Sequence, residues 1–586
     1  MPVRNRVLKT KITDFTELLL QKKTVSIKEL AKKLDLSFES VEQIGKALEK
    51  QGVVDVQYPA TMVQGPRIVL KKELPVTKKT SLPGELIEEY SFEVDFIPIQ
   101  IRILTSAEEN RPIYELQRPI IDSYTHVFLI ELKDEISEKI PIDAVEIIDL
   151  EKSQELKKRF FEITKKEIKK IISSESEENI NILGAWLLQE MYGLGEIEAI
   201  LGDDSLEEIA INSAKTPITV YHRKHGWMKS NITIESEEKI KNYASQIGRN
   251  VGREITNLAP ILDAHLISGD RVNATLNPIS SFGNTITIRK FSKRPWTITD
   301  FIGDKHTMNI EMASILWMAM QYEMNIIVAG GTASGKTSTL NSLSAFIPSY
   351  HRVISIEDVR EIVLPDYMRW NWVPTTTRNP NPEGKGEIGM LHLLQSSLRM
   401  RPDRIIVGEI RKKEEAEVLF EAMHTGHSVY GTIHADSARQ ILRRLLEPPI
   451  ALPPLMVEAI DLLLVQYRDR KTNVRRTFEL SEIETGTEDE HLSVNTIFKY
   501  DPRQDDWEAV NPASKFIRQL NLHTGMTEEE ITKELMDRAK ILKWMKTNKI
   551  TELNEVGKVM EIFYSTPEVI KKAAKKNLSL KEVLGA

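Results

Sequence analysis

Hydrophobic positions near the start of the chain repeat first with helical and then with strand spacing. Apolar residues begin at Phe15 and recur at helical intervals up to Leu48, and two short apolar runs follow. Ser26 and Ser37 precede two of the helical stretches and are typical N-cap residues. This order of elements resembles a winged helix-turn-helix, so we expect a winged-helix-like domain at residues 1–75.

The pattern changes twice more before residue 300. Alternating apolar and polar residues predict short strands in a small α+β domain at residues 80–150. A lysine-rich amphipathic helix and a polar linker are expected at residues 151–178. From residue 179 to 292 strand-like and helix-like segments alternate, which predicts an α/β domain.

A phosphate-binding pattern follows the apolar run at residues 326–329. Residues 330–337 read Gly-Gly-Thr-Ala-Ser-Gly-Lys-Thr and fit G-x-x-x-x-G-K-[ST], between an expected strand and an expected helix. Lys336 supplies a cation for the β- and γ-phosphates, and the Thr337 hydroxyl is placed to ligate Mg²⁺. The residues expected to contact the nucleotide are Gly330, Thr332, Ala333, Ser334, Gly335, Lys336, Thr337 and Ser338. The pattern therefore predicts a nucleoside triphosphate site.

Three later motifs also lie where an expected strand ends. Glu357 and Glu361 belong to a carboxylate cluster, Glu409 follows an apolar run, and His434 follows the strand after that. Acids at strand ends also cap helices, and a lone histidine is more often structural than functional. Four such sites in order within one domain favour a single site at the carboxyl edge of a parallel sheet.

Two arginines upstream of the phosphate loop occupy strand-like positions. Arg271 lies in Gly-Asp-Arg-Val-Asn-Ala, and Arg289 lies in Thr-Ile-Thr-Ile-Arg-Lys-Phe. Their spacing fits either solubilising surface charges or residues that reach a γ-phosphate.

Composition narrows the classes of protein. The 586 residues require several domains, and the formal net charge of -7 makes a nucleic acid an unlikely main partner. The chain has no cysteine, so a cysteine zinc site is excluded and no zinc site is expected. No apolar run reaches the length of about 18 residues that a membrane span needs. We expect a cytoplasmic protein whose membrane association is peripheral.

The chain resembles the secretion ATPase superfamily of type II and type IV secretion and type IV pilus systems. Four motifs carry the resemblance: Gly-Gly-Thr-Ala-Ser-Gly-Lys-Thr, Ile-Glu-Asp-Val-Arg-Glu, Arg-Pro-Asp-Arg-Ile-Ile-Val-Gly-Glu-Ile-Arg and Gly-Thr-Ile-His-Ala-Asp-Ser. They correspond to that family's phosphate loop, Asp box, Walker B motif and His box, and the match extends over residues 180–480. The resemblance implies a ring-shaped homo-hexamer that hydrolyses ATP with Mg²⁺ at the inner face of the membrane. Its partners would be an integral membrane platform protein and, indirectly, pilin-like subunits.

The resemblance also implies roles for individual residues. Glu361 would be the catalytic carboxylate, with Glu357 as the alternative, and Glu409 would support the metal together with Thr337. Arg271 and Arg289 would be arginine fingers on a mobile domain. Apart from the resemblance, the position of His434 just past its strand would allow it to hydrogen-bond the γ-phosphate or to report its loss.

Some residues differ from the common family pattern and resemble one branch of the family. His265 stands where the family often has arginine, which leaves a charge contact near Arg271 open. The absence of cysteine, the pair Arg475-Arg476 and Glu482 resemble the archaeal branch of pilus and archaellum ATPases.

The expected function is assembly of an archaeal type IV pilus-like filament or secretion of its subunits. The alternatives are an archaellum motor, a DNA-translocating P-loop ATPase and a nucleotide sensor that barely hydrolyses ATP. The acidic third helix of the winged-helix segment opposes DNA binding.

The expected fold class is multidomain α/β. A RecA-like P-loop ATPase domain with a parallel sheet at residues 300–500 follows the α/β N-terminal domain at 179–292. The winged-helix-like segment begins the chain, and a helical C-terminal tail is expected at residues 510–586.

Overall fold

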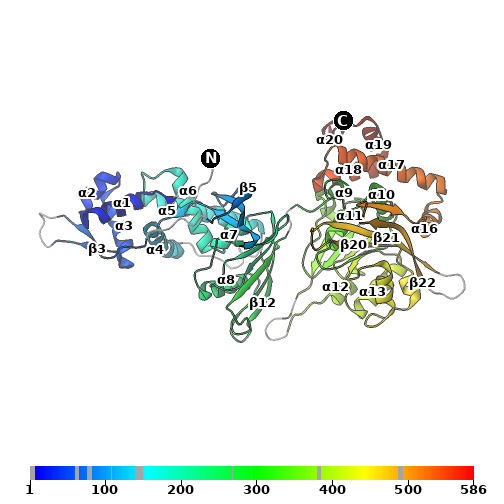
Figure 1. Cartoon of the computed structure of the whole chain (residues 1–586), viewed down its shortest axis with the longest axis horizontal. Helices are drawn as coiled ribbons and strands as arrows, with labels where there is room; N and C mark the ends of the chain where they lie inside the picture. The colour runs from blue at the N-terminus through cyan, green and yellow to red at the C-terminus, as the bar shows by residue number, and fades with distance from the viewer. Residues whose placement is uncertain are drawn as a thin grey trace. The chain divides into compact units, whose positions relative to one another are not determined.

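The chain folds into two compact units, Met1–Ser292 and Lys293–Ala586. The structure is a computed structural model (Figure 1). It describes residues 7–59, 65–75, 82–106, 109–139, 150–266, 268–291, 294–378, 380, 385–485 and 492–585.

The N-terminal segment has the three helices and small sheet of a winged helix. Its elements are α1 (Lys11–Lys22), β2 (Thr24–Ser26), α2 (Ile27–Leu34), α3 (Phe38–Lys50), β3 (Val54–Gln57) and β4 (Arg67–Leu70). The side chain of Ser26 accepts the N–H of Glu29, and that of Ser37 accepts the N–H of Ser40. Both predicted N-caps are therefore confirmed, and the three strands form an antiparallel sheet in the order β2-β4-β3.

The rest of the first unit is built on a nine-stranded sheet in the order β12-β13-β14-β9-β10-β11-β7-β6-β5. Its strands are β5 (Glu85–Val94), β6 (Ile97–Ser106), β7 (Glu109–Gln117), β9 (Leu206–Ile211), β10 (Thr219–His222), β11 (Gly226–Ser230), β12 (Ile261–His265), β13 (Arg271–Thr275) and β14 (Thr285–Arg289). The short strands β1 (Val7–Leu8) and β8 (Ile120–Ile121) pair separately. The segments expected at 80–150 and 179–292 share this sheet, because β7 and β11 pair in parallel at Ile113↔Lys229 and Tyr114↔Ser230. The domain boundaries drawn from the sequence stay predictions.

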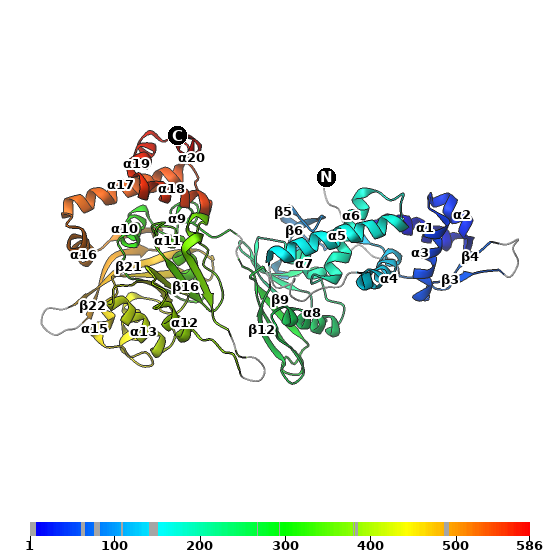
Figure 2. The same cartoon turned by 180° about the vertical axis from the view of Figure 1, so that it is seen from behind.

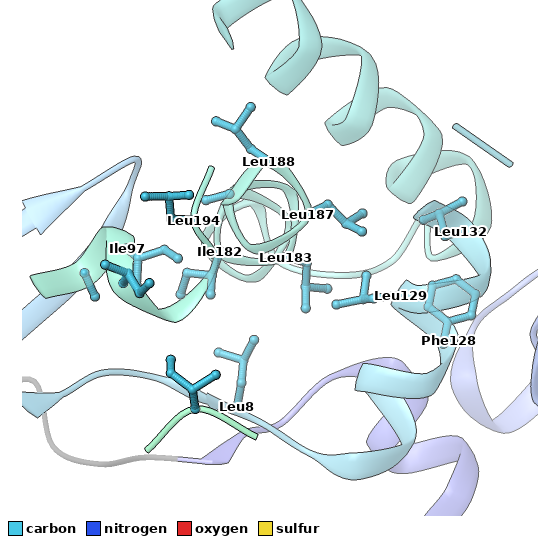
Figure 3. Packing of buried hydrophobic residues seen from close by; sticks show 14 of the residues in the cluster. Leu8, Ile97, Phe128, Leu129, Leu132, Ile182, Leu183, Leu187, Leu188 and Leu194 are labelled. Carbon is cyan, nitrogen blue, oxygen red and sulfur yellow. The ribbon is translucent and has the colours of Figure 1, made fainter. Parts of the chain in front are cut away.

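Helices cover this sheet and supply the core of the first unit. They are α4 (Ser123–Lys139), α5 (Leu150–Ile171), α6 (Glu177–Met191), α7 (Glu196–Leu201) and α8 (Glu237–Asn250). Figure 3 shows Ile182 and Leu183 of α6 between Ile97 of β6 and Leu129 of α4, and all four side chains are buried. Helix α6 therefore joins the helical layer to the sheet.

The second unit has its own nine-stranded sheet, in the order β17-β16-β18-β19-β15-β20-β21-β22-β23. The strands are β15 (Ile326–Gly330), β16 (Val353–Glu357), β17 (Trp372–Thr376), β18 (Arg404–Val407), β19 (Ser428–Ile433), β20 (Leu462–Arg468), β21 (Arg475–Thr485), β22 (Leu492–Asp501) and β23 (Asp506–Ala509). The strands from β17 to β20 are parallel, whereas β20 to β23 are antiparallel. The parallel part brings the carboxyl ends of β15, β16, β18 and β19 to one edge.

Both faces of this second sheet are covered by helices, as Figures 1 and 2 show. Ile326 and Val328 pack into one apolar cluster, whereas Ile327 and Ala329 pack into the other, because successive side chains of a strand point to opposite faces. On the first face lie α9 (Ile298–Ile302), α10 (Ile310–Gln321), α11 (Lys336–Ser344), η1 (Asp366–Asn371), α16 (Ser514–Thr524), α17 (Glu528–Thr547), α18 (Leu553–Ser565), α19 (Pro567–Lys576) and α20 (Leu580–Leu584). On the second face lie α12 (Met390–Ser397), α13 (Lys413–His424), α14 (Ala438–Leu446) and α15 (Pro454–Val457).

The predicted helical tail is part of the core of the second unit. Arg538 of α17 is 1 % exposed, donates to Gln321 of α10, and lies over the ring of Trp317 at 5.6 Å. A buried guanidinium needs such partners, so this contact ties the tail to the helix that precedes the phosphate loop. Among the described helices, none combines the length and apolar composition needed to cross a membrane. The expected fold class, multidomain α/β with a parallel P-loop sheet, is confirmed.

Candidate functional site

All four nucleotide motifs of the sequence meet at the carboxyl edge of the second sheet. Strands β16, β18, β19 and β15 are consecutive parallel neighbours, and each is followed by one motif. The strands come from residues 326 to 433, yet their ends lie side by side because parallel strands point the same way.

The phosphate loop has the open backbone that an anion requires. Gly330 has φ +152°, and a Cβ there would collide with the Gln466 carbonyl oxygen and the Ser334 hydroxyl. Gly335 has φ +98° and is the N-cap of α11, so it has no side chain to accept the first N–H groups of the helix. The helix N-terminus is therefore available to an anion.

The other loop residues surround this opening. Lys336 Nζ donates to the carbonyl oxygens of Gly330 and Gly331 at 3.1 and 3.2 Å. The Ser334 hydroxyl is buried and has no hydrogen-bond partner among the described residues. The remaining predicted contacts are Thr332 and Ala333, which are exposed, and Thr337 and Ser338, which are half-buried in the first turn of α11.

A chain of polar and charged side chains crosses from the phosphate loop to the Asp box. Lys336 Nζ lies 3.5 Å from His434 Nδ1, and His434 Nε2 lies 3.4 Å from Glu409 Oε1. Arg411 Nη2 lies 2.6 Å from Glu409 Oε2, and Arg411 Nη1 donates to Asp358 at 2.6 Å. Partial burial and the nearby Lys336 ammonium lower the pKa of His434, which favours a neutral imidazole between the ammonium and the carboxylate.

Glu357 differs from the other carboxylates of the edge because it is only 2 % exposed. Its Oε1 accepts the backbone N–H groups of Glu361 and Ile362 at 2.8 and 3.0 Å. Its Oε2 has no partner in the described part of the chain. Burial raises the pKa of Glu357 to about 7. Glu357 therefore fixes the turn that carries the half-buried Glu361 and is itself poised to exchange a proton near neutral pH.

The two predicted arginine fingers lie in the first unit. Arg271 begins β13, Arg289 ends β14, and the two residues are direct partners across these antiparallel strands. Arg271 makes a two-point ion pair with Asp263, through Nη2 to Oδ2 at 3.0 Å and Nε to Oδ1 at 3.2 Å. Because His265 is the strand partner of Arg271 and burial lowers its pKa, the charge contact near Arg271 comes from Asp263.

Two residues of the site were missing from the sequence prediction. Asp358 and Arg411 connect the Asp box with the Walker B motif, and Asp358 also accepts the Thr377 hydroxyl at 3.0 Å. Both lie inside the quoted motifs, immediately after Glu357 and two residues after Glu409. Their position next to predicted site residues could have marked them in the sequence. Their pairing depends on β16 and β18 being neighbouring strands.

The oxygen donors at this edge suit a magnesium ion that is completed by phosphates. Thr337 offers a hydroxyl and Glu409 a carboxylate, and Mg²⁺ prefers oxygen ligands and keeps several waters. The described residues contain no group of three or more histidine, cysteine, aspartate and glutamate side chains that could hold a metal by themselves. The open loop, the uncapped α11 and the unpartnered Ser334 hydroxyl fit a nucleotide that brings the remaining ligands.

Known proteins are similar to parts of this chain. The family model described as "Type II/IV secretion system protein" matches residues 197–470. An uncharacterized protein of Methanocaldococcus jannaschii is 33% identical over 385 residues, which are 64% of this chain and 69% of that protein. The type IV secretion system protein PtlH of Bordetella pertussis is 30% identical over 288 residues, which are 44% of this chain and 84% of that protein.

A solved structure is also similar. The crystal structure of the VirB11 ATPase from the Brucella suis type IV secretion system is 25% identical, with a TM-score of 0.25, and covers 48% of this chain and 90% of its own. The sequence matches carry the assignment, and the residues that the family model matches include the phosphate loop and the three motifs that meet it at the sheet edge. Because PtlH is 30% identical and is covered over 84% of its length, the chain belongs to the type II/IV secretion system protein family.

Proposed function

We propose that this protein hydrolyses the β–γ anhydride of ATP, with Mg²⁺, to drive assembly of an archaeal type IV pilus-like filament or secretion of its subunits. The observation that carries the proposal is the contact series from Lys336 through His434 to Glu409 at the mouth of the phosphate loop. A cation suits phosphate oxygens and a carboxylate can hold Mg²⁺ or orient water, and the imidazole of His434 lies between the two.

The phosphate loop holds the substrate through its backbone and Lys336. The ammonium now bonds to two loop carbonyls, and it would exchange these neutral acceptors for phosphate oxygens, which form stronger charge-assisted bonds. The N–H groups that begin α11 would hold a second set of oxygens. Thr337 and Glu409 would hold Mg²⁺, which when bound supplies positive charge that stabilises the transferring phosphoryl group.

The carboxylates orient the attacking water. We assign this role to Glu361, whose backbone position is fixed by Glu357. Glu357 remains the alternative, because its pKa of about 7 suits a general base. His434 lies between Lys336 and Glu409, so loss of the γ-phosphate would change both of its neighbours.

Arg271 and Arg289 would complete the site from the first unit of the same or an adjacent subunit. Arg271 and Arg289 are direct partners across β13 and β14, so the sheet brings both guanidinium groups to one place. As arginine fingers they would close on the γ-phosphate and open after hydrolysis, which converts the chemical step into movement of one unit. We propose a homo-hexamer at the inner face of the membrane, with an integral membrane platform protein as its partner and pilin-like subunits moved indirectly.

An archaellum motor is the alternative within the same mechanism. Deleting the gene and examining the cells separates the two: loss of pilus-like filaments with intact swimming supports the pilus, whereas loss of swimming supports the archaellum motor. DNA translocation is disfavoured, because Lys50 and Gln51 at the end of α3 both contact the carboxylate of Glu131 of α4, which offsets the positive charge of Lys50.

The test is ATP turnover, measured as phosphate release over a range of protein concentrations. Lys336→Ala should lower turnover by at least about a hundredfold, because it removes the cation of the phosphate site. Lys558→Ala is the matched control, since Lys558 is an exposed lysine on α18. Specific activity that climbs with concentration supports a site completed by assembly. Wild-type turnover in Lys336→Ala would remove this loop as the active site, and a wild-type protein without turnover would favour a nucleotide sensor.

A further inference from the structure

The hairpin of β20 and β21 extends beyond the strand end from which the phosphate loop begins. Strand β20 pairs with β15 up to Gln466↔Gly330 and then continues to Arg468. Across the hairpin, Arg468 is the partner of Arg475, the first residue of β21. Arg475 is therefore held at the level of the phosphate loop, although it lies more than a hundred residues later in the chain.

The Arg475 side chain contacts the outer part of the loop. Its Nε donates to the carbonyl oxygen of Ala333 at 3.0 Å, and its Cδ lies 3.7 Å from the position of a Cβ on Gly335. Ala333 has φ +58°, in the left-handed region that residues other than glycine rarely adopt. Such a conformation persists where surrounding contacts hold it, and the bond from Arg475 is one of these contacts.

The base of Arg475 is rigid. The next residue, Arg476, is 8 % exposed and makes two bonds to Asp505, at 2.6 and 2.8 Å. Arg476 also donates to the carbonyl oxygen of Lys305 at 3.1 Å, and the N–H of Thr477 donates to that of Thr307 at 2.7 Å. The start of β21 is thus fixed on two sides, which allows Arg475 to place a loop atom accurately.

We propose that Arg475 is a positioning residue of the nucleotide site. It holds Ala333 in the left-handed conformation and so keeps the N–H groups from Gly335 to Thr337 turned toward the phosphates before nucleotide arrives. This inference rests on the proposed function of the loop, and it concerns affinity more than the chemical step. The nucleotide itself holds the loop once it is bound, so the rate at saturation should change little.

The test compares Arg475→Met and Arg475→Lys with Arg470→Ala in the full-length protein. Methionine keeps much of the stem and removes the donors, lysine restores one charged donor, and Arg470 is an exposed arginine of the same hairpin. Calorimetric titration with ADP and Mg²⁺ should give a Kd raised about tenfold in Arg475→Met, as expected for a lost charged hydrogen bond. Arg475→Lys should recover part of the loss, and Arg470→Ala should keep the wild-type Kd.

Two further measurements separate positioning from a general loss of structure. ATP turnover of Arg475→Met should show KM raised about tenfold and kcat within about twofold of wild type. Hydrogen exchange without nucleotide should be faster in the peptide that contains residues 331–337 and unchanged in α10. An unchanged Kd with unchanged loop exchange would overturn the proposal, as would a loss of kcat at constant Kd. Failure of the proposed function is distinct, because then Lys336→Ala would leave turnover intact.

Discussion

The two nine-stranded sheets of this protein bring functional residues together in different ways. In the second unit, parallel strands separated by helices deliver Lys336, Glu357, Glu409 and His434 to one edge. In the first unit, the consecutive antiparallel strands β13 and β14 make Arg271 and Arg289 direct partners. A parallel sheet therefore gathers residues that are distant in sequence, whereas a hairpin pairs residues that are close.

The two groups of residues differ in what their side chains contact. The edge residues of the second unit contact one another, from Lys336 to Arg411. The arginines of the first unit contact acids of their own sheet, with Asp263 bonded to Arg271 and Glu208 opposite Arg289. We therefore expect the edge to bind nucleotide by itself and the arginines to contribute only to hydrolysis.

The largest expected effect is the loss of ATP hydrolysis when either arginine of the first unit is removed. Arg271→Ala and Arg289→Ala should each lower ATP turnover by about 10³-fold, the range found for arginine fingers. ADP affinity should stay within about threefold of wild type, since the phosphate loop lies in the other unit. Arg249→Ala, an exposed arginine of α8, is the control. Wild-type turnover in both variants would show that the first sheet supplies no catalytic group.

The next largest effect concerns the carboxylates of the second sheet. Glu361→Gln should bind ATP and hydrolyse it at least about a hundredfold more slowly, because an amide cannot accept the proton of water. Glu421→Gln on the exposed face of α13 should behave as wild type. If Glu357→Gln shows the loss and Glu361→Gln does not, the role belongs to Glu357, and the rise of its rate with pH should have a midpoint near 7 in the wild type.

The smallest effect is on stability. Burial raises the pKa of Glu357 from 4.5 to about 7, so the folded state binds a proton that the unfolded state releases. Its contribution is fully present below pH 4.5 and is lost as pH rises through about 7, a loss of about 3 kcal/mol at 1.36 kcal/mol per pKa unit.

Glu357→Gln lacks this titration and serves as the comparison. Denaturant unfolding without nucleotide measures the unfolding free energy of both proteins. The unfolding free energy of the wild type should fall relative to that of the variant between pH 5 and pH 8. A constant difference across that range would mean that Glu357 is ionised throughout and would contradict the raised pKa.

Local motifs in the sequence marked residues that lie together at the sheet edge, whereas some pairings of distant strands had no such signal. Lys336, Glu409 and His434 follow apolar strands in local motifs, and the structure brings these three side chains together. The pairing of β7 with β11 had no local signal, because it joins Ile113 and Tyr114 to residues more than a hundred positions later. The contact of Arg475 with Ala333 also had no local signal, because two adjacent arginines after a strand do not indicate which residues they contact.

By itself, the sequence determined which functional groups are present and on which kind of element each lies. They are a glycine loop with a lysine, carboxylates and a histidine at strand ends, and arginines on strands. These are local properties, because loop conformation, hydrophobic periodicity and helix capping depend on neighbouring residues. Only the tertiary structure decided which groups lie in contact, which carboxylate is buried and has a raised pKa, and which hairpin reaches the phosphate loop. Burial and long-range contacts depend on how distant strands and helices pack, and no short stretch of sequence contains that information.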